Sequence, residues 1–518
     1  MKKSVLFIVP MLVMLFGMSA CKNNEPAGPT DKAKYTVILY ANGGENLDYL
    51  EERDISEAAA EIAKKKDDLS VRFIVFMKYS SQKGLDKQNE DMMKNQGKAY
   101  VPGGQAGKVY FYEAGPACID FNNTKDIQCL SLPDKWIADE SDAPMYDPKY
   151  MADVFKNVAK SAPAENYILV LSGHAAGWEP NDDGDYPKPA NIKNSAITDA
   201  FFDGRAIKAK ELHDGIQQSG LHFSAVIFDC CLQNSIEYLS ELTDVTTYTL
   251  ASGHTTHGGD YSALVQELYA APQDQDGLKK ALSRYAEVYA KNHKEDWEDG
   301  KSDKVLMNVD FAVAEMAKMP AVWTSLKSIV DYMCANLKDS AAYTIPSRQC
   351  YHYYNASPQY DLVDYLDKMK KDDGAPYAND TAYQQLFNDV YYAMDNAIVY
   401  HAYALHYVSN LPDDTEAPKL SMNINLGAKG RIQASFQESE DHPSCYQCYD
   451  SEGKEWYFNP TATPTWSKGT NTNVEYEWQY SYGKSIFDQK TGWTRWLKLN
   501  PVLPYGNPPI DDDGDTNE

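Results

Sequence analysis

Two short apolar runs, each leading to a reactive side chain, constrain the fold of this chain most strongly. Phe223 to Phe228 is almost wholly apolar, as in a buried strand of a parallel sheet, and leads to Cys231. Ile168 to Leu171 is a second such run and leads to His174. Ligands of open α/β sheets bind at the carboxyl ends of the strands. We therefore expect the thiol and the imidazole to meet at one sheet edge, as a nucleophile and its base.

The residues that follow the cysteine pair have helical spacing. Leu232, Ile236 and Leu239 predict a helix that starts close to Cys231. Because the unpaired N–H groups of a helix N-terminus favour a thiolate, this arrangement predicts a lowered thiol pKa. The neighbouring Cys230 is expected to be buried in the core rather than reactive.

Strands and helices alternate over most of the chain, which predicts an α/β fold with a mostly parallel central sheet flanked by helices. Ser80 to Gly107 is polar and glycine-rich and is predicted as a loop or a small hairpin. Residues 437–509 are predicted as a smaller, mostly β or irregular C-terminal part, and residues 510–518 as an acidic, disordered tail. Further strands are predicted at 35–40, 71–77, 109–112, 246–252, 305–309 and 420–426, helices at 47–64, 146–160, 207–220, 263–269, 278–293 and 322–337, and a helix passing into a strand at 381–406.

Residues 1–20 have the layout of a secretory signal peptide. Lys2 and Lys3 precede an apolar run, Val5 to Met18, that ends in small residues and Cys21. The ending Met18-Ser19-Ala20-Cys21 resembles a bacterial lipobox, in which the cysteine carries the lipid. We expect residues 21–34 to be a tether. The mature protein is then expected in the bacterial cell envelope, at the outer membrane or cell surface, anchored through lipid on Cys21.

Charge and cysteine content bound the partners and the redox state. Lys and Arg number 49 against 75 Asp and Glu, a net charge of -26, which argues against nucleic acid as a partner. An exported location permits disulfides, although sequence leaves their connectivity open. Cys21, Cys230 and Cys231 are three of the nine cysteines. The other six fall into local pairs, namely Cys118 with Cys129, Cys334 with Cys350 and Cys445 with Cys448.

Three stretches resemble the clostripain family, which are caspase-like cysteine peptidases. YTVILYANGGENLDYL (35–50) is similar to the family's opening strand and helix, LSGHAAGW to its histidine motif, and FDCCLQNSIEYLSEL to its cysteine motif. The resemblance implies a caspase-like sandwich and a peptidase domain over residues 35–436. It also implies that His174 is the catalytic histidine and that Cys231 is the nucleophile. Asp229 matches the acidic floor of the family's S1 pocket, which implies peptide or protein substrates cleaved after Arg or Lys.

Two positions depart from the family pattern. Ala175 stands where the family has glycine, and the backbone N–H there is expected to share the oxyanion hole with the N–H of Cys231. The loop Gly253 to Asp260 replaces acidic and Gly-Trp-Pro elements of the family. These departures motivate an alternative function, a catalytically silent lipoprotein that binds peptides or proteins on the same fold.

Other interpretations of the same residues remain open at this point. Asp229 is also suited to capping a following helix. His254 and His257 have the spacing of metal ligands, which would suit a metal-dependent hydrolase, although a surface or cleft-lining role is favoured. No cofactor is expected, but Asn181 to Asp185 resembles part of a calcium loop. If self-cleavage activates the chain, candidate sites between the two strands are Lys188, Lys193 and Arg205.

Overall fold

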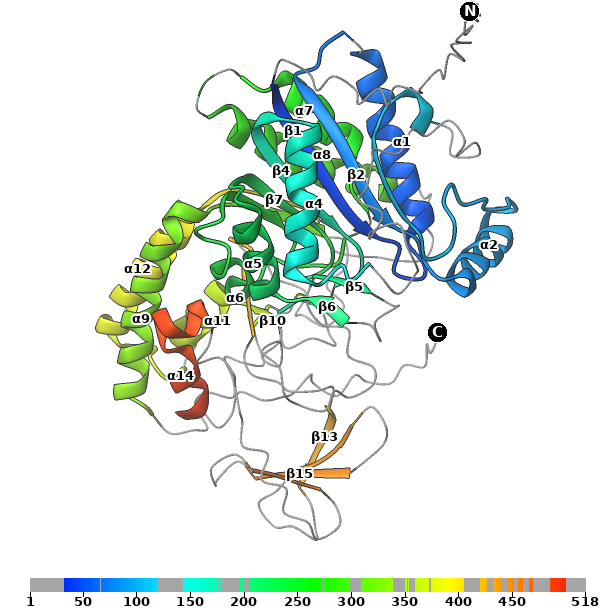
Figure 1. Ribbon diagram of the computed structural model, residues 1–518. Helices are drawn as coiled ribbons and strands as arrows, with labels where there is room; N and C mark the ends of the chain where they lie inside the picture. Colours follow the sequence, from blue (N-terminus) through cyan, green and yellow to red (C-terminus); the bar gives the residue numbers. More distant parts are fainter. Residues whose placement is uncertain are drawn as a thin grey trace, which may run out of the picture.

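A central sheet of eight strands organises the computed structural model, in the order β11-β9-β8-β7-β4-β1-β2-β3 (Figure 1). The strands β2, β1, β4, β7 and β8 run parallel to their neighbours. The outer strands are antiparallel, with β3 against β2, β9 against β8 and β11 against β9. The mostly parallel sheet is thereby confirmed. The strands are β1 (Ala33–Asn42), β2 (Val71–Lys78), β3 (Val109–Glu113), β4 (Ala164–Ser172), β7 (Phe223–Asp229), β8 (Thr246–Ala251), β9 (Val309–Glu315) and β11 (Ile398–Ala404).

The structure describes part of the chain, and all statements below refer to that part. The described residues are 32–65, 67–119, 143–175, 177–178, 196–199, 205–256, 258–272, 274, 276–298, 309–338, 350–351, 353, 359–371, 374–404, 420–425, 432–438, 446–450, 455–459, 465–468 and 485–499. The lipobox, the tether up to residue 31 and the acidic tail therefore lie outside it. Within these residues no helix combines the length and apolar character needed to cross a membrane.

Two hydrophobic cores lie on opposite faces of the sheet. Successive residues of β1 alternate between them, since Ile38 and Tyr40 belong to one core and Val37 and Leu39 to the other. Figure 1 shows α4 and α5 beside each other over one face. The first core includes residues of α4 (Pro148–Ser161), α5 (Ala209–Ser219), α9 (Met319–Ala335), α11 (Leu362–Lys371) and α12 (Thr381–Ala397), and the second includes residues of α1 (Asp48–Lys64), α7 (Tyr261–Ala270) and α8 (Gly277–Glu298).

Most predicted strands and helices agree with the structure, but one loop prediction is wrong. The segment Ser80 to Gly107 contains the helix α2 (Gln82–Gln96). The Ser81 hydroxyl caps its start by accepting from the Gly84 N–H, and Gly97 ends it with φ +65°. Strand β9 is described over Val309–Glu315, and residues 305–308 of the strand predicted at 305–309 lie outside the described part.

The short elements include two small sheets. The antiparallel pair β5 (Ala196–Asp199) and β6 (Arg205–Ile207) lies between β4 and β7 in sequence, and β10 (Gln359–Asp361) pairs with β12 (Asn423–Asn425). The strand predicted at 420–426 is therefore shorter than expected. Arg205, one of the candidate cleavage sites, is held in β6 by an ion pair to Glu211 at 2.9 Å. Lys188 and Lys193 lie outside the described residues.

The C-terminal part combines a β-sheet with two helices that the sequence did not predict. Its described residues include a four-stranded antiparallel sheet, after which the chain forms α13 (Ile486–Thr491) and α14 (Trp493–Leu499). Trp493 and Trp496 are fully buried in the first core. The Trp496 indole N–H donates to the Tyr365 hydroxyl at 3.0 Å. The sheet consists of β13 (Ile432–Glu438), β14 (Tyr446–Asp450), β15 (Glu455–Asn459) and β16 (Thr465–Lys468).

One suggested disulfide is wrong. Cys334 and Cys350 are both free thiols, the first half-buried on α9 and the second fully buried. Cys118 is buried. Its suggested partner Cys129 lies outside the described residues, as do the environments of Cys445 and Cys448.

Candidate active site

The sheet brings the predicted nucleophile and base to matched positions. Strands β4 and β7 are parallel neighbours in which Ser172 pairs with Asp229. His174 and Cys231 each follow two residues beyond this pair, so they leave the sheet at the same edge and at the same step. The Gly173 N–H donates to the Asp229 carbonyl at 3.4 Å and extends the pairing beyond the strands. Both side chains are half-buried.

The chain turns sharply after Cys231, and the helix predicted there begins later than expected. Leu232 has φ +63°, a left-handed conformation that is uncommon for a branched residue and is found where a site requires it. Its N–H donates to the His254 carbonyl at 2.9 Å rather than joining a helix. The helix α6 is short and spans only Ile236–Ser240. No helix N-terminus therefore begins at Cys231 to lower its thiol pKa.

The surroundings of Cys231 instead favour the neutral thiol. Burial raises the pKa of the Cys231 thiol, and the Thr256 N–H, which donates to Sγ at 3.4 Å, only partly offsets this effect. The neighbouring Cys230 is fully buried, and its thiol donates to the Leu171 carbonyl at 3.6 Å. The two sulfurs thus have different environments, and the predicted burial of Cys230 is confirmed.

His174 lies between the end of β4 and the loop that follows β1. Gly173, directly before it, has φ +147°, a backbone conformation that favours glycine. The His174 Nε2 atom and the Asn46 Oδ1 atom are 2.5 Å apart. Ala175 is half-buried and packs against the first core. Two segments therefore position the His174 side chain: its own backbone after β4 and the loop after β1 that carries Asn46.

Asp229 is buried at the end of β7 and is only 5% exposed. Its Oδ2 atom accepts from the Tyr261 hydroxyl at 2.7 Å and from the Ser172 hydroxyl at 3.0 Å. Burial raises the pKa of Asp229, while these donors and the nearby Arg53 oppose the rise. The helix-capping alternative is wrong, because α6 begins only at Ile236 and the Asp229 carboxylate bonds elsewhere.

A second carboxyl group, Glu51 of α1, joins Asp229 through Ser172. The Ser172 hydroxyl lies 2.5 Å from Glu51 Oε1 and 3.0 Å from Asp229 Oδ2, yet it has one hydrogen to donate. When Glu51 is protonated, it can donate its hydrogen to the Ser172 hydroxyl. The hydroxyl groups of Ser172 and Tyr261 can then both donate to Asp229. Burial, and then the charge of Asp229, hold the pKa of Glu51 well above its usual range, in agreement with this arrangement. The larger rise at Glu51 favours this residue, rather than Asp229, as the one that holds a proton.

Two further charged groups of α1 lie next to this pair. Asp54 is buried, and burial raises its pKa well above the usual range although Arg53 opposes the rise. The Arg53 guanidinium forms an ion pair with Asp54 at 2.7 Å and is partly exposed. A Cβ atom added to Gly258 would lie 2.7 Å from Asp54 Oδ2, which shows how closely the loop after β8 approaches these side chains.

His254 is buried, so the surface or cleft-lining role expected for it is wrong. Its Nδ1–H donates to the Tyr353 carbonyl at 2.9 Å, and the Tyr351 hydroxyl donates to Nε2 at 2.7 Å. Both ring nitrogens thereby hold Tyr351 and Tyr353 against the loop after β8. Among the described residues no three His, Cys, Asp or Glu side chains are arranged as a metal site. His257 and the segment Asn181 to Asp185 lie outside the described part.

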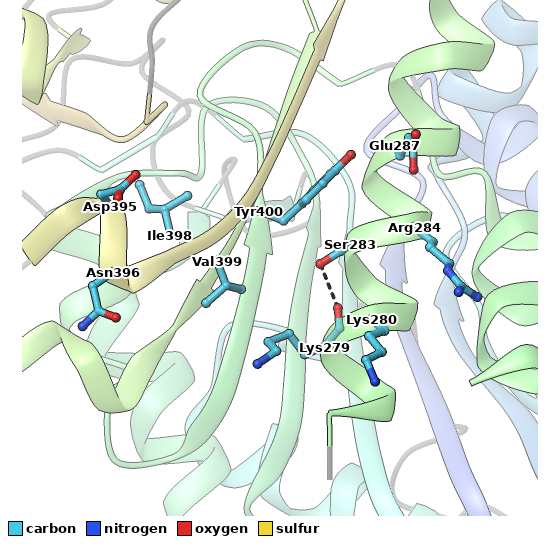
Figure 2. A pocket seen from close by; sticks show the side chains of 10 residues that line it. All are labelled: Lys279, Lys280, Ser283, Arg284, Glu287, Asp395, Asn396, Ile398, Val399 and Tyr400. Atoms are coloured by element: carbon cyan, nitrogen blue, oxygen red, sulfur yellow. Dashed lines mark hydrogen bonds between the residues drawn. The ribbon is translucent and has the colours of Figure 1, made fainter. Parts of the chain in front are cut away.

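A hollow of about 540 Å³ lies away from these residues, between α8 and β11 (Figure 2). Its basic side chains already have acidic neighbours, since Lys279 pairs with Asp276 and Lys280 with Asp274, each at 2.9 Å. None of the candidate catalytic residues lines it. The hollow therefore does not define the active site.

Comparison with known proteins agrees with the geometry at the sheet edge. The Clostripain family matches residues 39–456, which is most of the chain. The chain belongs to the clostripain family. It is accordingly a cysteine-type peptidase, and the family resemblance seen in its three motifs is confirmed.

Solved structures of clostripain-family proteins share the fold. A secreted C11 cysteine protease from Bacteroides thetaiotaomicron, iotapain, superposes with a TM-score of 0.51 at 16% identity, over 76% of this chain and 94% of the other. A secreted C11 cysteine protease from the same organism, in complex with an irreversible peptide inhibitor, gives 0.52 at 14% identity, over 89% and 99%. No curated protein matches the sequence. The caspase-like α/β fold expected from the motifs is confirmed.

Several residues of this clostripain-family site were not recognised in the sequence. Asn46 of the loop after β1 contacts His174, Glu51 of α1 contacts Ser172, and Tyr261 of α7 contacts Asp229. The motif YANGGENLDYL contains Asn46, but nothing in its local pattern distinguishes it from an ordinary turn residue. Only the three-dimensional arrangement identifies it.

Proposed function

We propose that the chain is a lipid-anchored cysteine endopeptidase that hydrolyses peptide bonds after Arg or Lys. Cys231 is the nucleophile and His174 is its base. The observation that carries the proposal is the register of β4 and β7, in which Ser172 pairs with Asp229 and both reactive side chains follow at the same step. Membership of a cysteine peptidase family supports the same assignment.

The reaction begins with transfer of the Cys231 proton to His174. The resulting thiolate attacks the scissile carbonyl carbon, and the carbonyl π electrons move to oxygen. As the tetrahedral intermediate collapses, the C–N bond breaks and the imidazolium of His174 gives its proton to the leaving amine. Water, deprotonated by His174, then hydrolyses the thioester and releases the acid and the thiol. Because burial raises the pKa of the Cys231 thiol, the resting thiol is neutral and must transfer its proton to His174 before it can attack.

The oxyanion is stabilised by backbone N–H groups. We assign the N–H of Cys231 and the N–H of Ala175 to this role, since both residues directly follow the sheet edge. Donors of this kind stabilise charge without a titrating side chain, and losing one costs about 100- to 1,000-fold in kcat. Ala175 provides the same N–H as the glycine of the family motif.

Asp229 binds the basic side chain of the substrate. Support comes from its burial at the sheet edge and from its two hydroxyl donors, which favour an ionised carboxylate in this apolar setting. A guanidinium can make paired hydrogen bonds to a carboxylate, whereas an ammonium acts as a point charge, so we expect Arg to be preferred over Lys. Calcium is not assigned a role in this reaction.

The anchoring part of the proposal rests on residues 1–21. The lipobox ending at Cys21 would fix the mature protein to the cell envelope, at the outer membrane or the cell surface. Cys21→Ser should move the protein from the membrane fraction to the soluble fraction and abolish incorporation of radiolabelled palmitate. Retention of both properties would refute lipid anchoring and leave the peptidase assignment untouched.

The peptidase assignment is tested with a positional-scanning library of fluorogenic peptide amides. Wild type, Cys231→Ala, His174→Ala and the control Cys334→Ala are compared as full-length, reduced proteins. We expect cleavage after Arg and Lys only in wild type and the control. Turnover that survives Cys231→Ala would refute the mechanism. Saturable peptide binding by a wild-type protein that cleaves no library member would instead support the silent, peptide-binding alternative.

A further inference from the structure

The loop between β1 and α1 forms a seat for the His174 ring. The His174 Nε2 atom and Asn46 Oδ1 are within hydrogen-bond distance at 2.5 Å. Gly44 lies against the same ring, because a Cβ atom added there would be 3.0 Å from His174 Cδ2. Gly44 also has φ +53°, a conformation that costs a side-chain-bearing residue energy. The ring is thus contacted at its polar edge by Asn46 and on its carbon side by Gly44.

Backbone hydrogen bonds make this loop rigid. The Gly43 N–H donates to the Lys78 carbonyl at 2.9 Å, which ties the loop to β2. The Gly44 N–H donates to Asn42 Oδ1 at 2.9 Å. The N–H groups of Asn46 and Leu47 both donate to the Gly43 carbonyl, at 3.1 and 2.7 Å, and close a tight turn. Asn46 is therefore presented from a fixed backbone rather than from a mobile surface loop.

Residues between β2 and α2 also hold the same loop by hydrogen bonds. The Glu45 N–H donates to the Ser80 hydroxyl at 2.9 Å. In return the Glu45 carboxylate accepts from the Ser81 N–H at 3.0 Å. Ser80 in turn donates its N–H to Asp48 at 3.0 Å. The position of Asn46 thus depends on a network that does not include the catalytic side chains.

We propose that Asn46 is a positioning residue that sets the tautomer and orientation of His174. An amide oxygen accepts and does not donate, so it pairs with a proton on Nε2. In the neutral imidazole the lone pair then belongs to Nδ1, which becomes the nitrogen that receives the Cys231 proton. The same Nδ1 proton is passed to the leaving amine. This inference rests on the proposed role of His174 as the base.

The choice of an amide rather than a carboxylate has a consequence for charge. A carboxylate at this position would stabilise the imidazolium and raise the pKa of His174. The amide orients the ring without adding a negative charge to a site that already contains Glu51, Asp54 and Asp229. Asn46→Asp should therefore preserve the acceptor and change the proton affinity of the ring.

The test compares Asn46→Ala, Asn46→Asp and a control, Asn157→Ala, in the full-length protein. Asn157 lies on α4 and donates to the backbone carbonyl of Asp153 at 3.0 Å, away from the sheet edge. The measurements are kcat and KM for an Arg-amide reporter across pH, with thermal unfolding to verify folding. We expect Asn46→Ala to lower kcat by about 10- to 100-fold with KM within about threefold. Asn46→Asp should recover most of kcat and move the acid limb of the kcat profile to higher pH.

Two results would overturn the inference. Wild-type kcat and an unshifted profile in both Asn46 variants would show that the contact has no role in catalysis. Equal losses of kcat in both, with no shift of the acid limb, would assign Asn46 a merely structural role. If Asn46→Ala fails to fold, the profile of Asn46→Asp alone decides. His174→Ala and Cys231→Ala are measured in parallel, because turnover in those variants would refute the proposed function instead.

Discussion

Replacing a carboxyl group by an amide should leave kcat/KM nearly unchanged at Glu51 and lower it strongly at Asp229. The two carboxyls are joined through Ser172, at 2.5 and 3.0 Å, and because Ser172 has a single hydrogen to donate we expect Glu51 to hold the proton of this pair and Asp229 to be ionised. Gln resembles a protonated Glu because its amide N–H can donate to Ser172. Asn at position 229 keeps an acceptor for Tyr261 but removes the charge that binds the substrate.

The magnitudes follow from burial. Losing one partner of a desolvated charge pair costs about 2–4 kcal/mol, so Asp229→Asn should lower kcat/KM for an Arg-amide reporter by roughly 30- to 700-fold. A norleucine-amide reporter, which lacks the charge, should be cleaved equally by wild type and this variant. Glu51→Gln should keep kcat/KM for the Arg reporter within about threefold. The matched control is Glu61→Gln, on the same helix, where Glu61 pairs with Lys64 at the surface.

Stability gives a second readout of the proton on Glu51. The pKa of Glu51 is raised in the folded state, so the folded protein is favoured at low pH and loses stability as pH rises towards the folded pKa. Glu51→Gln has no such loss and should become more stable than wild type as pH rises above about 4.3, the ordinary Glu value. Urea unfolding across pH measures this difference. Equal activity losses in the two isosteric variants, or a Glu51→Gln variant less stable than wild type near about pH 7, would refute the proton assignment.

Three further outcomes follow from the site. Because burial raises the Cys231 pKa, iodoacetamide alkylation of the resting enzyme should still accelerate above about pH 8.5, and a plateau near about pH 7 would contradict this. Burial raises the pKa of Glu52 to about 7, so the wild-type protein should lose stability as the pH rises from about 4 to about 8. Glu52→Gln has no such loss, and in urea unfolding its stability relative to wild type should grow by up to about 3 kcal/mol over this range. His254→Ala should lower the unfolding free energy by about 2–4 kcal/mol, because it removes the hydrogen bonds to Tyr351 and Tyr353. An unchanged denaturation midpoint would show that these two hydrogen bonds do not stabilise the fold.

The sequence predicted the sheet well because buried parallel strands are visible as local apolar runs. Phe223 to Phe228 and Ile168 to Leu171 lie within adjacent strands, and the parallel register between them brings Cys231 and His174 to one edge. Their place at the same sheet edge therefore follows from a rule about strand ends. This is why the part of the site carried by these two strands was accessible from sequence.

The helix predicted after Cys231 begins later than expected because local periodicity competed with a long-range contact. Leu232, Ile236 and Leu239 are indeed buried, as their spacing indicated. The Leu232 N–H, however, bonds to the His254 carbonyl of the loop after β8. A tertiary hydrogen bond thus overrode helical propensity in the turn that follows the nucleophile, and no local pattern reports such a bond.

The missed helices show a different limit. In α2 only Gly84, Leu85 and Gln88 are buried, so its apolar signal is weak, and its clearest signs are the Ser81 cap and the Gly97 stop. In α13 the corresponding signs are Ser485 and Gly492. Capping residues carried more information there than hydrophobic spacing. Asn46 and Glu51 were missed for another reason, since their roles depend on partners in other strands.

The return of α13 and α14 to the first core has a consequence for how the protein matures. Trp493 and Trp496 fill space among α9 and α11, and the Ile486 N–H donates to the Glu241 carboxylate at 2.6 Å, directly after α6. A nascent chain that ends before these tryptophans leaves a gap beneath the helix that follows the nucleophile turn. Residues 485–499 must therefore be synthesised before the first core is complete, although the strands that carry Cys231 and His174 precede them in the chain by more than 250 residues.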